Sequence, residues 1–413
     1  MEFKSNIKAF SITIGALTLL TIGIVSYNIV SNNNDVTIES DFDNAIIGFI
    51  PQTKDSGFHD WFSPAILYCS VKDCRENTTF IDKNNKTIKI KTSGVGNAST
   101  ALNNSGDFII YDNDTYYTYF NKKYKLSKSK FSAPYSIYST MLSNQRFYGT
   151  ANMGSKEDNP GSGFYYSNIA ITPDKTIENA TLLQGYTFTC NDNIYFIEYL
   201  PSKNNIYENK FYKYNWDDYQ FEEYKKIQLS NFNAVKFHVC GKDYIDLVYR
   251  SNENDKFIRS RINLATDTFE NDIKSYPYFD KFVVYLSPNQ SFMRGNDLLA
   301  VNFDGRIFNF PKEGDEVTTE LELSRYFHRP HENALSFYGQ FKDDTFFAVG
   351  QSKHDPDKII GIVLDPTDWS EIASATLEIP TKEYGSKIPL FDFVIGDTNA
   401  VIDWINSQPP IPS

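Results

Sequence analysis

Four residue types are scarce in this chain of 413 residues, which contains 4 Cys, 4 Met, 4 Trp and 5 His. The sequence also lacks a Gly-rich phosphate loop, a Gly-x-Ser-x-Gly motif and a catalytic Cys–His signature. Without these motifs it supports neither nucleotide binding nor catalysis by a serine or cysteine nucleophile. Paired carboxylates of the kind that cleave glycans remain open, because Asp and Glu are plentiful.

Positive charge is also in short supply. The 52 acidic residues outnumber the 40 basic residues, which gives a net charge of −12. Phosphate binding requires a basic surface, so this balance argues against nucleic acid as a partner. It argues equally against electrostatic adhesion of the chain to anionic lipid.

The four cysteines permit three disulfide pairings, and the sequence does not choose among them. If the chain lies outside the cytoplasm, the preferred pairing joins Cys69 to Cys74 and Cys190 to Cys240. Free thiols are the alternative. Zinc is disfavoured, because the close pair has the spacing Cys-x4-Cys and no second Cys or His pair follows at finger spacing.

The longest uncharged run, Ala9–Val30, is rich in Ile, Leu, Val and Thr. It is long enough to cross a bilayer as a helix, and Lys4 and Lys8 precede it. Since positive residues stay in the cytoplasm, the sequence predicts a single-pass membrane anchor, with residues 1–8 inside and the body outside after a linker at 31–44. The alternative is a signal peptide that is cleaved to release a secreted protein.

The body that follows favours strands. Aromatic residues make up 16% of the chain, with 33 Phe and 28 Tyr, and such residues suit a pleated, half-buried surface. The best helical candidate is the short stretch Glu320–Phe327. The clearest hairpin joins Leu298–Phe303 to Arg306–Phe310 through Asp304-Gly305, a strong two-residue turn signal.

Looser hairpins follow the same plan at Phe108–Phe120, Ile194–Tyr214, Tyr244–Leu264 and Phe346–Leu364. A polar pair that often contains Asp precedes the hairpins, at Gly106-Asp107, Asp192-Asn193, Lys242-Asp243, Asn296-Asp297, Asp343-Asp344 and Gly396-Asp397. From Asp192 onward these pairs are 51, 54, 47 and 53 residues apart. A period of about 40–50 residues with several strands per repeat is typical of propeller blades.

In its architecture the body therefore resembles β-propeller proteins exposed on a cell surface, over about Ala45–Ile405. The spacing predicts six to eight blades, and seven fits best. Tandem β-sandwiches are the alternative. We expect Ala400–Ile405 to be the last strand and to close the ring on strands near the start, with residues 406–413 as a tail.

Several polar groups are candidates for chemistry. His59-Asp60-Trp61 offers a base, an orienting acid and a ring, while His328 and His331 look like metal ligands. The acidic turns Asp112-Asn113-Asp114 and Asp355-Pro356-Asp357 offer oxygen ligands for calcium, but neither continues into a twelve-residue calcium loop. We interpret all four as loops or turns and predict no cofactor, with Ca²⁺ as the one ion considered.

These observations favour a membrane-tethered extracellular binding or sensing domain over an enzyme. Its ligand would be a peptide, a glycan or a protein, and Trp61, Trp216 and Trp369 are the candidate contact rings. An extracellular glycan hydrolase or lyase that uses carboxylates is one alternative. A scaffold in an export or envelope-assembly complex is the other, since propellers serve many functions.

Overall fold

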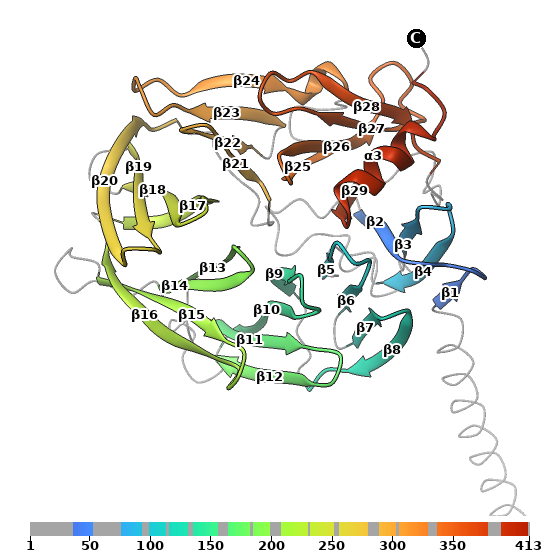
Figure 1. Ribbon diagram of the computed structural model, residues 1–413, viewed down its shortest axis with the longest axis horizontal. Helices are drawn as coiled ribbons and strands as arrows, with labels where there is room; N and C mark the ends of the chain where they lie inside the picture. The colour runs from blue at the N-terminus through green and yellow to red at the C-terminus, as the bar shows by residue number, and fades with distance from the viewer. Residues whose placement is uncertain are drawn as a thin grey trace, which may run out of the picture.

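The computed structural model describes residues 36–52, 76–92, 99–112, 115–130, 135–155, 164–181, 185–198, 208–229, 232–251, 256–279, 289–302, 305–328, 337–378 and 390–411. Within these ranges the strands form seven antiparallel sheets that stand around a common centre (Figure 1). The chain is a seven-bladed β-propeller, as the spacing of the polar pairs predicted. The alternative of tandem β-sandwiches is wrong.

Blades 2 to 7 each start with the strand nearest the centre and end at the rim. Blade 1 is described below. Blade 2 consists of β5 (Ser99–Leu102), β6 (Phe108–Asp112), β7 (Thr115–Phe120) and β8 (Lys123–Lys128). Blade 3 consists of β9 (Tyr135–Met141), β10 (Phe147–Ser155), β11 (Phe164–Ile171) and β12 (Thr176–Thr181). Blade 4 consists of β13 (Gly185–Cys190), β14 (Asn193–Glu198), β15 (Glu208–Asn215) and β16 (Gln220–Gln228).

Blade 5 consists of β17 (Phe232–Cys240), β18 (Tyr244–Ser251), β19 (Lys256–Asn263) and β20 (Thr268–Pro277). Blade 6 consists of β21 (Ser291–Arg294), β22 (Asp297–Val301), β23 (Arg306–Phe310) and β24 (Thr318–Glu322). Blade 7 consists of β25 (Phe337–Lys342), β26 (Thr345–Gln351), β27 (Ile359–Leu364) and β28 (Glu371–Thr376). The five hairpins predicted from the sequence are all pairs of second and third strands.

Five of the six polar pairs mark the turns between the first and second strands of blades 2, 4, 5, 6 and 7, whereas Gly396-Asp397 precedes a helix and not a hairpin. Asp107 shows why a carboxylate suits this position: its Oδ1 accepts a hydrogen bond from the backbone N–H of Asn121 at 2.8 Å, and its Oδ2 accepts one from Gln145 of blade 3 at 2.8 Å. Asp192 likewise accepts the backbone N–H of Ser143 at 2.9 Å. The sequence repeat is therefore a set of turn acceptors that also hold neighbouring blades.

Apolar clusters fill the space between neighbouring sheets, because successive strand residues point to opposite faces and both faces are covered. Between blades 1 and 2, the rings of Phe80 and Phe108 stack with centroids 3.7 Å apart. All six residues of β7 are buried, and four of them are aromatic. The aromatic bias of the sequence thus fills the seven inter-blade cores.

Blade 1 closes the ring by combining the two ends of the described chain. Its order from centre to rim is β29 (Leu390–Ile395), β2 (Ala45–Gln52), β3 (Glu76–Asp82), β4 (Thr87–Thr92) and β1 (Val36–Ile38). β2 and β29 pair antiparallel, and Phe49 pairs with Phe393 near the middle of this ladder. Closure of the ring is confirmed, and β1 lies inside the stretch that the sequence assigned to a linker.

The predicted closing strand Ala400–Ile405 is wrong, because these residues belong to the helix α3 (Thr398–Asn406). The side chain of Asp397 accepts the backbone N–H of Ala400 at 2.7 Å, which caps the helix. Val401, Trp404 and Ile405 are buried, at a spacing that places them on one helical face. The apolar residues of this short stretch were therefore misread as a strand, although their spacing is helical.

The predicted helix Glu320–Phe327 is also wrong. Its first residues belong to β24, where Leu321 pairs with Ile307, and only Leu323–Arg325 forms a short 3-10 helix. Pairing with β23 overrides the weak helical preference of this stretch. The anchor Ala9–Val30 lies outside the described residues, and no described helix is long and apolar enough to cross a membrane.

Candidate functional site

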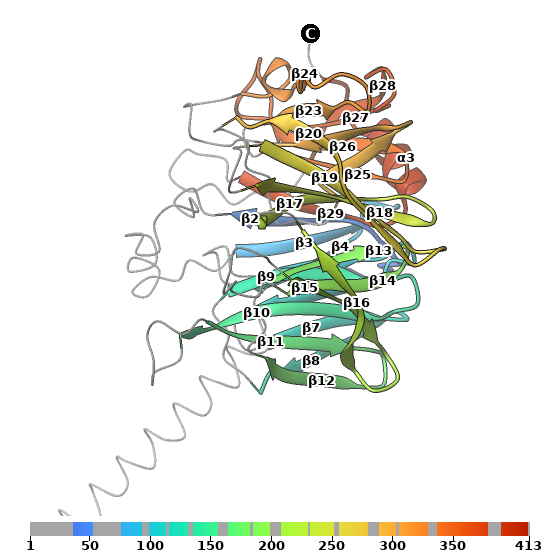
Figure 2. The ribbon, with the colours of Figure 1, turned by 90° about the vertical axis from the view of Figure 1, so that its left-hand side faces the viewer.

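Antiparallel order places the turns after the first and third strands of every blade on one face of the ring, which we name the turn face (seen edge-on in Figure 2). Among the candidate residues that the structure describes, Cys190, Cys240, Trp216 and Trp369 lie near this face, whereas Asp112, His328 and the turn Asp355-Pro356-Asp357 end or follow second or fourth strands and lie at the opposite face. The remaining candidates, His59, Asp60, Trp61, Cys69, Cys74, Asn113, Asp114 and His331, lie outside the described residues.

Cys190 and Cys240 form a disulfide, which is one of the two pairs preferred from the sequence. They end β13 and β17, the first strands of blades 4 and 5, so the bond joins two blades at the centre of the ring. Asn191 reinforces the junction, since its Nδ2 donates to the carbonyls of Gly241 and Lys242 at 2.9 Å each.

His238 lies beside this disulfide in the same junction. Its Nδ1 is 3.0 Å from the hydroxyl of Tyr186, its Nε2 is 3.3 Å from the carbonyl of Thr189, and its ring contacts Phe188. Burial lowers the pKa of His238 to about 4, against the opposing effect of the Thr189 carbonyl. The imidazole is therefore neutral and structural.

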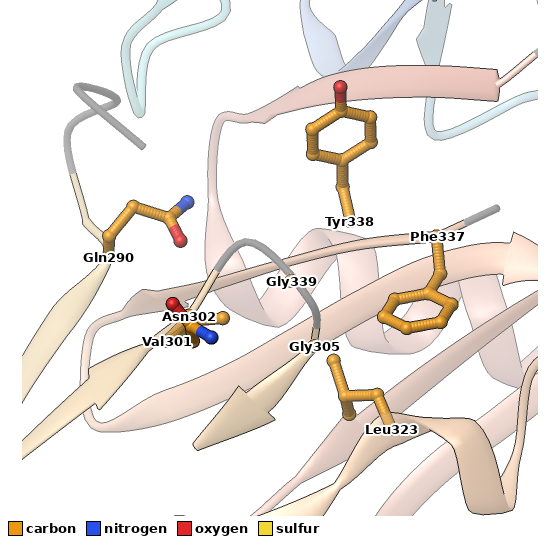
Figure 3. Close-up of a pocket in the computed structure, with 8 residues that line it drawn as sticks. All are labelled: Gln290, Val301, Asn302, Gly305, Leu323, Phe337, Tyr338 and Gly339. Carbon is orange, nitrogen blue, oxygen red and sulfur yellow. The ribbon is translucent and has the colours of Figure 1, made fainter. Parts of the chain in front are cut away.

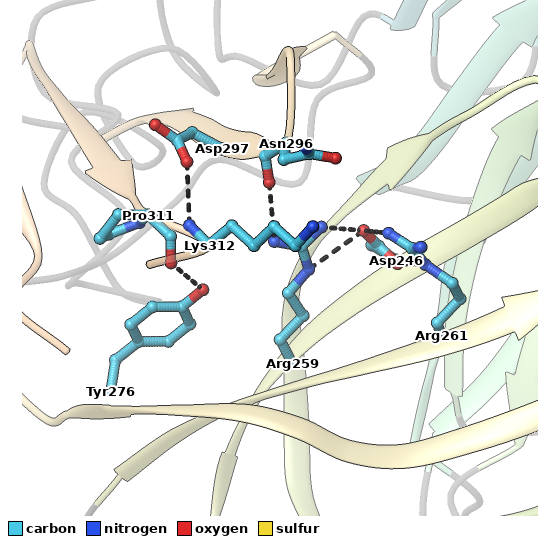
Figure 4. Close-up of polar contacts among 8 residues, drawn as sticks. All are labelled: Asp246, Arg259, Arg261, Tyr276, Asn296, Asp297, Pro311 and Lys312. Carbon is cyan, nitrogen blue, oxygen red and sulfur yellow. Dashed lines mark hydrogen bonds and ion pairs between the residues drawn. The ribbon is translucent and has the colours of Figure 1, made fainter. Parts of the chain in front are cut away.

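Charged side chains meet at the next junction, between blades 5 and 6 (Figure 4). Asp246 is fully buried and receives two guanidinium groups. Arg261 donates through Nε at 2.7 Å and through Nη2 at 2.8 Å, and Arg259 donates through Nε at 3.1 Å. Arg259 also donates to the carbonyl of Asn296 in the first turn of blade 6, at 3.0 Å. The cluster therefore docks blade 6 onto blade 5.

Trp369, a predicted ligand-contact ring, lies in the turn between β27 and β28. Its indole packs edge-on against Phe346, and Nε1 points to Glu320 of blade 6 at 3.5 Å. Arg294 pairs with the same carboxylate at 2.8 Å, and this hydrogen bond lowers the pKa of Glu320. Trp369 thus helps to join blades 6 and 7.

Trp216, the second described candidate, begins a turn of different character. We name Trp216–Tyr219, between β15 and β16, the aromatic turn. Trp216 is half-buried against Tyr214, with centroids 5.0 Å apart, and Arg146 of blade 3 lies 5.3 Å from the centre of its ring. Its Nε1 makes no hydrogen bond within the part of the chain that the structure describes.

Tyr219 closes the aromatic turn with a backbone φ of 61°. The equivalent position in blade 5 holds Asp267, a residue type that tolerates this left-handed conformation, and Trp369 in the corresponding turn of blade 7 also has a positive φ, of 62°. A bulky residue there costs free energy, on the order of 1 kcal/mol. The ring of Tyr219 contacts Lys175 of blade 3, whose Nζ lies 4.3 Å from the ring centre.

The aromatic turn therefore presents rings, cations and acids together. Asp217 and Asp218 between the two aromatic residues are exposed, and Arg146 and Lys175 reach it from two turns of blade 3. Sequence reasoning singled out Trp216 but missed Tyr219, Arg146 and Lys175. The signal for Tyr219 was present as an Asp-Asp-Tyr turn between two strands, whereas the two cations come from a neighbouring blade.

A small hollow lies between blades 6 and 7, lined by Gln290, Asn302 and Tyr338 among others (Figure 3). The centre of a water molecule has about 10 Å³ in which to move there, so the hollow fits one water. Gln290 is 7% exposed, and its Oε1 has no hydrogen-bond partner among the described residues. One bound water would satisfy it.

The acidic turn Asp355-Pro356-Asp357 uses its carboxylates locally. Asp355 Oδ1 accepts the backbone N–H of Asp357 at 3.3 Å, and Lys358 lies 3.7 Å from its other oxygen. His328 belongs to no group of metal-ligating side chains among the described residues. Its backbone N–H donates to the carbonyl of Gln351. Across the described ranges, no three His, Cys, Asp or Glu residues are arranged to hold a metal ion.

No family model matches the chain, and no curated protein matches it. Among solved structures it is similar to BamB from Moraxella catarrhalis, with 7% identity over 83% of this chain and 91% of that chain and a TM-score of 0.39. A protein from Lactobacillus plantarum shows 12% identity over 85% and 98% of the two chains, with a TM-score of 0.43. The WD40 domain of SCAP from fission yeast shows 8% identity over 87% and 96%, with a TM-score of 0.38. At these identities each likeness concerns the fold alone, so the chain stands as a seven-bladed β-propeller whose assignment rests on its strand pairing.

Proposed function

We propose that this protein is a membrane-tethered extracellular binding or sensing domain that takes its ligand at the aromatic turn. The observation that carries the proposal is Tyr219, an aromatic residue in a left-handed turn position. The left-handed backbone of Tyr219 costs conformational free energy, and its aromatic ring is nevertheless present at the turn face. Strained residues cluster at ligand sites. Tyr219 is flanked by exposed carboxylates, whereas Trp369, which shares its left-handed conformation, packs against Phe346 and Glu320 in a blade junction.

The chemistry of the turn suits a peptide or a glycan. Trp216 and Tyr219 offer apolar ring surface, and Asp217 and Asp218 offer carboxylates that accept hydrogen bonds. Arg146 and Lys175 offer donors in the same place. Rings combined with a small number of placed polar groups are typical of sites that recognise such ligands.

Two observations support the location outside the cytoplasm. The uncharged run Ala9–Val30 after Lys4 and Lys8 predicts an anchor with the body outside. The disulfide Cys190–Cys240 fits an oxidising compartment, because thiols are kept reduced in the cytosol.

Ligand binding is tested with the full chain in detergent on an array of peptides and glycans. We expect the chain to bind a subset of the probes. The variant Asp217→Asn/Asp218→Asn should bind the same probes with an affinity lower by tenfold or more, which corresponds to about 1.4 kcal/mol. Both carboxylates are exposed, so the amides leave the fold intact. The matched control is Glu313→Gln/Glu316→Gln, which changes two exposed acids in the turn between β23 and β24 of blade 6. Equal retention by all three chains would contradict a site at the aromatic turn.

Topology is tested separately by protease treatment of intact cells. We expect the propeller to be cleaved while a cytoplasmic marker stays whole. A propeller that is degraded only after cell lysis would overturn the extracellular location and leave the array result to stand by itself.

A further inference from the structure

The described chain begins at the rim of the ring, in β1. Residues 31–35 alone separate β1 from the predicted anchor, and five extended residues span at most about 18 Å. If the anchor crosses the bilayer, the rim of blade 1 must lie close to the membrane surface (Figure 1). The outermost strand of the neighbouring blade 2 is β8.

The rim of blade 2 is basic although the whole chain is acidic. Residues 121–130 contain five lysines and no acidic residue, and all five lysines are exposed: Lys122, Lys123, Lys125, Lys128 and Lys130. Lys122 pairs with Asp43, and Lys128 donates to Thr115 at 3.0 Å. Lys123, Lys125 and Lys130 stand on the outermost strand or just after it, facing solvent.

Two exposed apolar side chains lie on the same rim. Ile38 of β1 is 46% exposed and Leu126 of β8 is 47% exposed. Val36 and Tyr124, two positions before each of them, pack into one cluster between blades 1 and 2. Alternate residues of a strand share a face, so Ile38 and Leu126 flank the outer end of the same junction.

Three acidic groups of this region are engaged with the protein itself, whereas Asp41 is exposed. Glu39 accepts the backbone N–H of Thr87 at 3.0 Å, and Glu178 of blade 3 accepts the backbone N–H of Lys130 at 2.6 Å. Asp43 is held by Lys122, with Lys83 nearby. The positive charge of β8 therefore faces outward without an equal number of free carboxylates.

We propose that the rim formed by β1 and β8 rests on anionic lipid headgroups, with the lysines of β8 on the phosphates and with Ile38 and Leu126 in the interface. This inference rests on the proposed tether for its geometry. Lysines beside apolar residues are the arrangement that binds membrane surfaces. The net charge of −12 disfavours adhesion of the chain as a whole, but its effect on the rim is weak, because charges more than about 8 Å away are largely screened at physiological salt.

The test places a photo-crosslinking amino acid, p-benzoylphenylalanine, at position 126 or 38 of the full chain in vesicles that contain phosphatidylglycerol. Positions 273 and 372, exposed isoleucines on the outermost strands of blades 5 and 7, are the controls. We expect lipid adducts at 126 and 38 to exceed those at the controls by about fivefold or more, and to fall in phosphatidylcholine alone.

Charge reversal supplies the second arm. We expect Lys123→Glu/Lys125→Glu/Lys130→Glu to remove most adducts at position 126, since each lysine near an anionic surface contributes roughly fivefold in binding. The matched control Lys242→Glu/Lys256→Glu/Lys353→Glu changes three exposed lysines of blades 5 and 7 and should leave the adducts unchanged. Similar adducts at all four positions, or equal effects of the two triple variants, would overturn the proposal.

Extraction of the same vesicles with alkaline carbonate reports on the tether independently. A chain that resists extraction but shows no excess adduct at 126 overturns the rim contact and leaves the tether standing. A chain that is extracted yet forms adducts that depend on phosphatidylglycerol overturns the tether and supports the rim as a lipid-binding surface.

Discussion

At the scale of single residues, the charged groups near the centre of the ring join neighbouring blades. Asp246 is buried under Arg259 and Arg261, and Arg259 extends the contact to blade 6. A buried ion pair gains little over apolar residues of the same size, but removing one partner leaves an uncompensated charge. The cluster therefore specifies how two blades meet more than it adds stability.

We predict that Asp246→Ala lowers the free energy of unfolding by about 3–5 kcal/mol, because two guanidinium groups lose their carboxylate. Urea unfolding followed by circular dichroism measures the loss. Asp217→Ala, at an exposed position of the aromatic turn, is the control and should change the value by less than about 0.5 kcal/mol. A loss of that small size for Asp246→Ala would contradict the structural role.

His238 makes stability depend on pH. Its pKa is about 4 in the folded protein and about 6.5 when unfolded, so the unfolded chain binds the proton more tightly. The contribution of this residue is full above pH 6.5 and is lost as pH falls towards 4, by about 3 kcal/mol in total. In His238→Gln, which cannot titrate, unfolding measured from pH 7 to 4 should show a correspondingly weaker pH dependence. An identical slope in both proteins would count against the buried neutral imidazole.

At the scale of elements, the C-terminal helix secures the closure of the ring. Trp404 of α3 is buried against blade 1, and its Nε1 donates to Asn85 in the turn between β3 and β4 at 2.6 Å. On the other side, Thr376 of β28 donates its backbone N–H to the carbonyl of Pro409 at 2.8 Å. The segment from α3 to the tail therefore bridges blades 7 and 1.

Beneath α3, the first strands of the same blades are joined directly. Gln340 Nε2 donates to the carbonyl of Phe393 at 2.9 Å, and Lys342 Nζ donates to the carbonyl of Ile395 at 2.7 Å. Burial lowers the pKa of Lys342 to about 8, while Asp343 and Asp397 favour its charged form. These contacts hold β29 of blade 1 against β25 of blade 7.

We predict that Trp404→Ala costs about 3–5 kcal/mol of unfolding free energy, as expected for a large buried ring. The loss should be measured by thermal and urea unfolding. Ile372→Ala, on the exposed face of β28 near the helix, removes a comparable apolar side chain outside the core and should be close to neutral. Equal losses in both variants would mean that α3 does not hold the closure.

At the scale of the whole molecule, the disulfide Cys190–Cys240 restrains a ring that hydrogen bonds also close. Cys190 and Cys240 are 50 residues apart in sequence, so the bond closes a loop about one blade long. In the chain-entropy treatment, a loop of this length stabilises the folded state by about 4 kcal/mol. The ring itself does not depend on the bond, since β29 pairs with β2.

We predict that Cys190→Ser/Cys240→Ser folds into the same propeller with a free energy of unfolding lower by about 4 kcal/mol. Circular dichroism reports the fold, and urea unfolding reports the loss. Adding a reductant to this variant is the control, because it isolates any effect of Cys69 and Cys74. A variant that unfolds at the same urea concentration as the native chain would contradict the stabilising role.

The sequence by itself determined the repeating unit. The Asp-containing pairs and the Asp-Gly turn at Gly305 mark local backbone conformations that few residue types adopt, and Gly305 has a φ of 79°. Aromatic and β-branched runs between these turns then specify strands, and their spacing indicates a propeller of six to eight blades. Such signals are readable because each depends only on neighbours in the chain.

Only the tertiary structure decided what the blades bring together. Ala400–Ile405 is helical because Asp397 caps it and because blades 1 and 7 cover one face, which no pattern within six residues reveals. Tyr219 meets Lys175, and Asp246 meets Arg259, through packing and strand pairing, while Val36 and Tyr124 of two rim strands pack into one cluster between blades 1 and 2. Contacts between residues far apart in the chain depend on the closed ring, so their chemistry became visible only once all seven blades were in place.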